Sequence, residues 1–233
     1  MTERHILYAL ATKITAHVGR GQAVLDLLRD LGVDVSGKNR ELLLSPDDKM
    51  YEYYLLGALK TDFVDKFYIK ADEECPDVLD FVAFMKEIGG IAAYAYLGDV
   101  GNSVTGDKKM QKFEDDYLDE LVEWLSDAGF NAITYMPTRN TPAQLLRLMK
   151  LCEKHSLFQI SGEDINTPFQ SFICKALDEP RYRHLIDSTW ALIGHELAAT
   201  QDIQNAMFSA KTCSEMPDLT VRINFFRNIS QNP

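Results

Sequence analysis

Three polar segments of this sequence combine side chains that could hold a metal ion and an anionic substrate. Each segment follows a short apolar stretch and precedes an amphipathic one. They carry Tyr96 and Asp99, then Arg139, then Glu163, Asp164 and Asn166. Carboxylate and amide oxygens suit a divalent cation, and a guanidinium suits phosphate or carboxylate oxygens. Asp99, Asp164 and Asn166 are therefore candidate metal ligands, and Tyr96, Arg139 and Glu163 are candidate substrate contacts.

Each of these side chains also has a structural explanation. Asp164 and Asn166 could cap a helix that follows Pro168. Asp99 lies in a glycine-rich stretch and could be a turn residue. Arg139 could pair with a surface carboxylate. The functional interpretation therefore depends on all three segments being polar at the same end of the fold.

From Gly90 onward the pattern predicts alternating strands and helices. Apolar strands begin near residues 91, 131 and 158, and each is followed by a polar loop and an amphipathic helix. Near-continuous apolar strands separated by helices indicate a parallel sheet with helical crossovers. In such sheets ligands bind beyond the carboxyl ends of the strands, where the three polar loops would lie.

Residues 1–88 have a mainly helical pattern and are predicted to form an insertion or cap, while residues 89–233 hold the strand–helix units. The run Ser45–Asp48 predicts a helix start, because a hydroxyl can cap, proline fits the first turn, and acids favour the positive helix end. Another helix should start at Pro76 and end at the pair Gly89–Gly90.

Composition narrows the classes of partner and the cellular compartment. The net charge of -11 argues against nucleic acid or an anionic membrane as the main partner. No apolar run reaches the roughly 20 residues that span a bilayer, and the N-terminus lacks a signal-peptide pattern. We expect a cytoplasmic protein whose scattered cysteines are reduced thiols. These are Cys75, Cys152, Cys174 and Cys213.

The sequence lacks several motifs of well-known enzyme classes. Its five histidines show neither HxH nor HExxH spacing, and no GxSxG, Walker-type or GxGxxG motif is present. A histidine-rich zinc site, a serine hydrolase, a P-loop enzyme and a classical dinucleotide-binding protein are therefore disfavoured. His195 lies in an apolar helical pattern, where a core histidine is the simpler interpretation.

The order of three segments resembles the C-terminal half of the PHP (polymerase and histidinol phosphatase) family. The segments are "GGIAAYAYLGD", "LVEWLSDAGFNAITYM" and "LMKLCEKHSLFQISGEDIN", within residues 76–175. The resemblance implies part of a distorted (β/α)7 TIM-like barrel, with the helical first half as an insertion. It also implies divalent metals and hydrolysis of a phosphomonoester by metal-activated water.

Carried onto this chain, the resemblance implies that Asp164 binds a metal with the help of Asn166 or Asp99, and that Arg139 holds the substrate phosphate. Tyr96 stands where the family has the histidine of Ala-His-Pro, and Asn166 stands where it has its last histidine. The family's opening His-x-His strand has no counterpart here. We therefore expect the C-terminal part of a longer protein, with an incomplete site for Mn, Zn, Mg or Fe.

The leading interpretation is a PHP-like phosphoesterase acting on a small phosphorylated substrate. A second is a non-catalytic relative that uses the same scaffold to bind a small anion or a partner. A third is a TIM-barrel sugar isomerase or epimerase, which would need more histidines and glutamates at strand ends than this chain supplies. Exposed apolar strand edges in an incomplete barrel also predict self-association.

Overall fold

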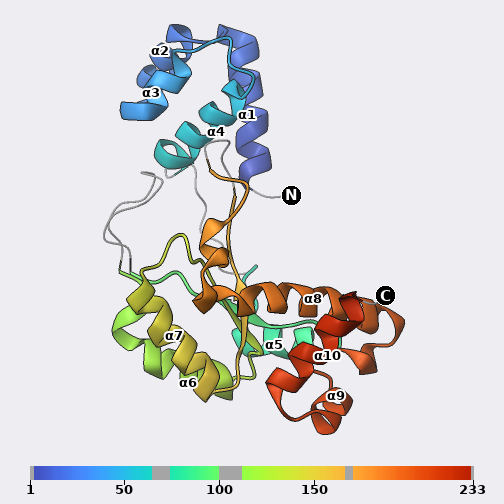
Figure 1. The fold of residues 1–233 in the computed structure, drawn as a ribbon. Helices are drawn as coiled ribbons and strands as arrows, with labels where there is room; N and C mark the ends of the chain where they lie inside the picture. The colour runs from blue at the N-terminus through green and yellow to red at the C-terminus, as the bar shows by residue number, and fades with distance from the viewer. Residues whose placement is uncertain (1–2, 65–73, 100–111, 166–169, 232–233) are drawn as a thin grey trace. The chain divides into compact units, whose positions relative to one another are not determined.

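The chain forms two compact units that divide between Glu74 and Cys75 (Figure 1). The computed structural model describes residues 3–64, 74–99, 112–165 and 170–231. The division lies before the boundary predicted at residue 88. The reason is α5 (Val78–Glu87), which contributes Val82 to the core of the second unit.

The first unit is helical. Its helices are α1 (Glu3–Val18), α2 (Gln22–Asp30), α3 (Gly37–Leu43) and α4 (Tyr51–Asp62). Leu7, Ala11 and Ile14 recur at helical spacing along α1 and are buried, and α1 packs on α4. Leu55 and Leu59 of α4 complete this contact with fully buried side chains. The predicted helical character of this region is therefore confirmed.

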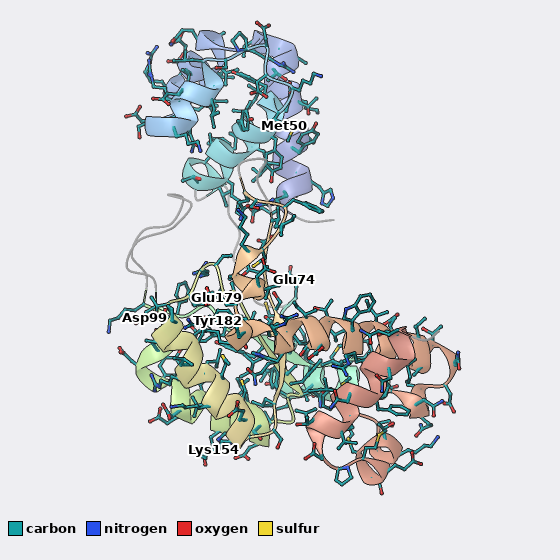
Figure 2. All side chains as sticks on the ribbon, viewed as in Figure 1. Met50, Glu74, Asp99, Lys154, Glu179 and Tyr182 are labelled. Atoms are coloured by element: carbon teal, nitrogen blue, oxygen red, sulfur yellow. The ribbon has the colours of Figure 1, made fainter. Side chains whose placement is uncertain are left out.

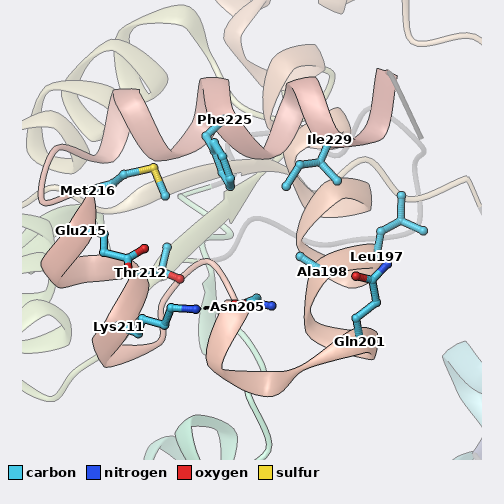
Figure 3. A pocket seen from close by; sticks show the side chains of 10 residues that line it. All are labelled: Leu197, Ala198, Gln201, Asn205, Lys211, Thr212, Glu215, Met216, Phe225 and Ile229. Atoms are coloured by element: carbon cyan, nitrogen blue, oxygen red, sulfur yellow. Dashed lines mark hydrogen bonds between the residues drawn. The ribbon is translucent and has the colours of Figure 1, made fainter.

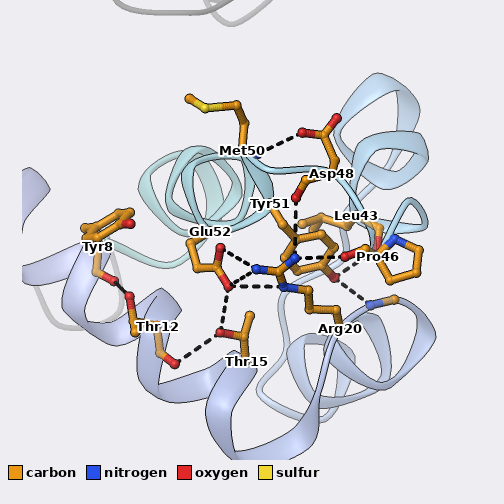
Figure 4. A network of polar contacts seen from close by, with 11 residues as sticks. Tyr8, Thr12, Thr15, Arg20, Leu43, Pro46, Asp48, Met50, Tyr51 and Glu52 are labelled. Atoms are coloured by element: carbon orange, nitrogen blue, oxygen red, sulfur yellow. Dashed lines mark hydrogen bonds and ion pairs between the residues drawn. The ribbon is translucent and has the colours of Figure 1, made fainter.

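The predicted helix start at Ser45–Asp48 was wrong. These residues form turns, and α4 begins only at Tyr51. The carboxylate of Asp48 accepts a hydrogen bond from the Met50 backbone N–H at 2.8 Å. The segment is held in this form by Arg20, which donates to the Pro46 carbonyl at 2.9 Å (Figure 4).

The second unit contains a parallel three-stranded sheet in the order β1–β2–β3. Its strands are β1 (Ala93–Ala95), β2 (Ala132–Tyr135) and β3 (Phe158–Ser161). The connections contain α6 (Leu118–Asp127) and α7 (Pro142–Lys154). Ala132 of β2 pairs with Ala93 on one side and with Phe158 on the other. The predicted α/β class and the parallel pairing are confirmed.

Alternate residues of the strands enter two different cores. Ile133 and Tyr135 pack with the buried faces of α6 and α7. Ala132 and Phe158 point to the opposite side and pack with residues of the C-terminal helices. Both faces of the sheet are therefore covered, which explains why its strands read as continuous apolar runs.

The chain ends in a helical group. It consists of α8 (His184–Gln201), α9 (Ala210–Glu215) and α10 (Leu219–Gln231). α8 and α10 lie against each other so closely that a Cβ at Gly194 would come within 1.8 Å of the Phe226 carbonyl oxygen. Among the described helices, none has the length and apolar character needed to cross a membrane.

Candidate functional site

The three polar loops that follow the strands meet at the carboxyl end of the sheet, as predicted. The Leu97 carbonyl of the first loop accepts from Asn140 Nδ2 at 2.7 Å and from Arg139 Nε at 3.2 Å. The backbone N–H and hydroxyl of Thr138 donate to the Glu163 carboxylate of the third loop at 2.9 and 2.6 Å. The second loop therefore joins the other two.

The first loop is anchored by Glu114, a residue that the sequence interpretation missed. Its side chain is only 2% exposed. Its carboxylate accepts from the backbone N–H of Leu97 at 2.9 Å and of Gly98 at 3.2 Å, and from the Tyr94 hydroxyl at 3.2 Å. A buried carboxylate with several donors is a stable arrangement, so Glu114 fixes the path of the chain just after β1.

Asp115 forms a second anchor beside it. Its carboxylate accepts from the Tyr96 hydroxyl at 2.5 Å, from the Asp99 backbone N–H at 3.1 Å and from Gln144 Nε2 at 2.6 Å. Burial opposes ionisation of Asp115, but these hydrogen bonds outweigh it and hold the pKa of the carboxyl below its ordinary value. Burial and the Asp115 carboxylate both raise the pKa of Tyr96.

Tyr96 was predicted to contact substrate, and the structure places it in the core instead. Its side chain is 1% exposed, and its hydroxyl donates to Asp115. Gly98 has a φ of +66°, and a Cβ there would lie 2.6 Å from Asn140 Nδ2 and 2.8 Å from the Tyr96 hydroxyl. The first loop thus needs glycine at this position in order to pass Tyr96 and Asn140 closely.

Asp99, a predicted metal ligand, is used within the fold as a turn residue. Its carboxylate oxygen Oδ1 accepts from the Phe113 backbone N–H at 2.6 Å, and its carbonyl accepts from Gln144 Nε2 at 2.9 Å. Figure 2 shows Asp99 near the N-terminal end of α7, whereas Lys154 marks the C-terminal end of the same helix. The alternative interpretation of Asp99 as a structural residue therefore describes its contacts better.

Arg139 and Asn140 each have one side-chain polar atom that takes part in none of these hydrogen bonds. Among the described residues, Arg139 Nη2 and Asn140 Oδ1 are buried and have no hydrogen-bond partner. The guanidinium lies over the Phe113 ring, 5.9 Å from its centroid, and Asn140 is 7% exposed. Asn140 does not cap α7, because Thr141 forms a capping box with Gln144 there.

The third loop contributes differently from what was predicted. The Glu163 carboxylate is engaged by Thr138, so it links two loops. Asp164 is exposed, and its carbonyl accepts from Gln170 Nε2 at 2.9 Å. Asn166, the third predicted metal ligand, lies outside the described residues.

A divalent metal does not fit the side chains that the structure describes at these loops. Within residues 3–64, 74–99, 112–165 and 170–231, no group of three or more His, Cys, Asp or Glu side chains could hold a metal ion. The carboxylates that lie together, Asp99, Glu114 and Asp115, already accept hydrogen bonds from backbone and side-chain donors. These acids therefore organise the loops.

Tyr135, at the end of β2, takes part in a buried polar contact that the sequence interpretation also missed. Its hydroxyl donates to Gln159 Oε1 at 2.9 Å and lies 2.8 Å from His184 Nε2. Burial lowers the pKa of His184, so the imidazole is favoured in its neutral form. Tyr135 itself is fully buried, which makes this a core contact.

A separate cavity of about 470 Å³ lies between α8, α9 and α10 (Figure 3). Leu197, Phe225 and Ile229 form an apolar wall. Lys211 forms part of the polar wall and donates to Asn205 Oδ1 at 2.9 Å. None of the predicted site residues that the structure describes lines this cavity.

No protein-family model, curated protein or solved structure matches this chain.

Proposed function

We propose that the second unit binds a small phosphorylated molecule at the carboxyl end of its sheet, through Arg139 and Asn140. The observation that supports this most is the unpartnered Nη2 of the Arg139 guanidinium. A buried polar atom without a partner costs about 1–3 kcal/mol, and a ligand oxygen that pairs with it would recover that free energy. A phosphate oxygen is the ligand group that a guanidinium binds best.

Asn140 favours a ligand that carries a hydroxyl group as well as a phosphate. Its Nδ2 donates to the Leu97 carbonyl, which leaves Oδ1 as a buried acceptor without a donor in the described structure. A hydroxyl group of the ligand would supply that donor. A sugar phosphate or a glycerol phosphate has both groups, whereas inorganic phosphate at neutral pH satisfies mainly the guanidinium.

The neighbouring carboxylates are compatible with anion binding because they already accept hydrogen bonds from other groups of the fold. Glu114 accepts from the backbone of Leu97 and Gly98, and Asp115 accepts from Tyr96 and Gln144. These donors offset part of the negative charge that would otherwise repel a phosphate. The same carboxylates hold the Leu97 segment, whose carbonyl positions both Arg139 and Asn140.

Hydrolysis by a metal-activated water stays a prediction that follows only from the PHP resemblance. The described side chains do not fit the metal that such a reaction requires. The three parallel strands in chain order, with helices between them, are what supports a relation to a (β/α)7 barrel. Elemental analysis after incubation with manganese or zinc would test it, since a phosphoesterase needs retained metal that Asp164→Ala removes.

Calorimetric titration of the full chain with glycerol 3-phosphate, inorganic phosphate and glycerol tests the anion site. We expect glycerol 3-phosphate to bind most tightly and glycerol not to bind. Arg139→Gln should weaken glycerol 3-phosphate at least tenfold, because it removes a charge-assisted hydrogen bond. Arg29→Gln, which removes an exposed guanidinium in the first unit, is the matched control and should bind normally.

Two results would contradict this function. One is the absence of binding by any phosphate compound. The other is binding that Arg139→Gln and Arg29→Gln leave equally strong, because the anion would then bind elsewhere.

A further inference from the structure

The solvent-facing side of α8 carries a stripe of large apolar side chains. Four residues at intervals of four, three and four positions make up this α8 stripe. They are Ile186, Trp190, Ile193 and Leu197, exposed by 37%, 40%, 42% and 42%. These intervals are close to the 3.6 residues of a helical turn, which places the four side chains on one face of the helix. A monomer would leave this continuous apolar surface in water, which is unfavourable.

The stripe is independent of the contacts that hold α8 in the fold. Other faces of the helix provide the buried residues Leu185, Ala191 and Gly194, which pack against the rest of the second unit. Leu197 also lines the cavity that Phe225 of α10 lines, so the apolar surface extends onto the neighbouring helix (Figure 3).

Opposite charges stand at the two ends of the stripe. Arg183 precedes it, and Glu196 lies near its end. Both side chains are exposed, and neither forms an ion pair within the described part of the chain. Two parallel copies of α8 would bring Arg183 beside Arg183, whereas two antiparallel copies bring Arg183 to the helix end that carries Glu196.

The stripe is also self-complementary in the antiparallel orientation. A two-fold axis between Thr189 and Trp190 brings Ile186 of one copy level with Ile193 of the other, and places Trp190 within about one residue rise, ~1.5 Å, of its own counterpart. Isologous contacts of this kind are the commonest basis of homodimers. Tryptophan at the centre of an apolar contact is a residue type that often dominates the binding energy.

We propose that two copies of this chain associate through the α8 stripe, with their α8 helices antiparallel. Apolar burial around Trp190 provides most of the affinity, and the Arg183 and Glu196 side chains select the orientation. The proposal does not depend on the anion site at the sheet, because none of its residues takes part in that site.

Sedimentation velocity over a wide range of protein concentration tests this interface. The full chain should convert from monomer to dimer as its concentration rises. Trp190→Ala should weaken the dimer about a hundredfold, because it removes the central apolar contact. Trp124→Ala is the matched control, since Trp124 on α6 is exposed by 47% and lies outside the stripe. Circular dichroism should show that both variants are folded.

Charge reversal tests the orientation. Arg183→Glu and Glu196→Arg should each weaken the dimer about tenfold, and the double variant should restore it, because opposite charges meet again. A full chain that stays monomeric at every concentration would overturn the proposal. A dimer that Trp190→Ala leaves intact would overturn α8 as the interface, and failure of the double variant to restore the dimer would overturn the antiparallel arrangement.

Discussion

Arg20 and Arg139 each lie over an aromatic ring, and their hydrogen bonds differ. In the first unit, Arg20 lies 5.1 Å from the centroid of the Tyr51 ring and forms a two-pronged pair with the Glu52 carboxylate at 2.8 and 2.9 Å (Figure 4). In the second unit, Arg139 lies over the Phe113 ring, and its one hydrogen bond within the described residues runs from Nε to the Leu97 carbonyl.

The comparison separates a structural arginine from a candidate binding arginine. The nitrogens of Arg20 reach Glu52 and the Pro46 and Asp48 carbonyls, and Thr15 donates to the same Glu52 carboxylate. Nothing in the described structure pairs with Nη2 of Arg139. A guanidinium whose donors are all used contributes to stability, whereas one that is positioned but incompletely paired can bind an anion. Three predictions test this distinction and a fourth tests the buried histidines of the second unit; they begin with the largest expected effect.

Removing the anchor beneath Arg139 should have the largest effect. Glu114→Ala leaves the Leu97 and Gly98 backbone N–H groups unpaired in a buried position, which should lower the free energy of unfolding by about 3 kcal/mol. Urea unfolding followed by tryptophan fluorescence measures this, because both tryptophans lie in the second unit. Asp116→Ala, which removes an exposed acid beside it, should change stability by less than about 0.5 kcal/mol.

Arg20, whose donors are all used within the fold, should contribute to the stability of the first unit. Arg20→Gln breaks the pair with Glu52 and should destabilise the first unit by about 1.5 kcal/mol, since a two-pronged pair is stronger than an ordinary surface ion pair. Hydrogen exchange of α1 and α4 peptides, read by mass spectrometry, should show faster exchange in this variant. Unchanged exchange would mean that this network contributes little to the unit's stability.

The buried histidines should make the second unit sensitive to acid. Burial lowers the pKa values of His184 and His195 in the folded state, so the unfolded chain binds more protons below about pH 6.5. Their contribution is fully present above that pH, and the free energy of unfolding should fall as the pH is lowered from 7 to 5.

The histidine prediction has a matched pair of variants. His184→Gln should flatten the dependence of stability on pH in urea unfolding, because it removes one titrating group. His17→Gln replaces an exposed histidine of the first unit and should leave that dependence unchanged. Equal slopes for both variants would contradict the role given to burial.

The smallest effect on stability is expected at Arg139 itself. Among its described contacts, Arg139→Gln loses the bond to the Leu97 carbonyl and the contact with the Phe113 ring, but it also removes a buried nitrogen that has no partner, so the free energy of unfolding should change by less than about 0.5 kcal/mol. Phosphate binding should nevertheless be lost in the same variant. A large loss of stability would place Arg139 with Arg20 as a structural residue.

The apolar pattern was sufficient to predict the sheet but not its anchors. Strand starts expected near residues 91, 131 and 158 agree with β1, β2 and β3, because a strand buried on both faces reads as an unbroken apolar run. Glu114 and Asp115 stand in an acidic run just before α6, where acids simply suit a helix N-terminus. Only the folded chain brings them to the backbone N–H groups after β1.

The candidate site could also be predicted only in part from the sequence. Arg139 could be selected from its position after a strand, but its unpaired nitrogen depends on Phe113 and Leu97, which are distant in the sequence. Asp99 was predicted as a metal ligand and Glu163 as a substrate contact, because the sequence does not show whether a carboxylate already accepts hydrogen bonds within the fold. The turn at Ser45–Asp48 was predicted as a helix because Arg20, which holds its carbonyls, lies far upstream.

The most direct test observes both arginines at once. In proton–nitrogen spectra of the arginine side chains of the full chain, the Nε–H signals of Arg20 and Arg139 are assigned by substitution. Glycerol 3-phosphate is then added. We predict that the Arg139 signal shifts in a saturable way while the Arg20 signal stays in place. A stationary Arg139 signal at saturating ligand, or equal shifts of both signals, would contradict the anion site at the end of the sheet.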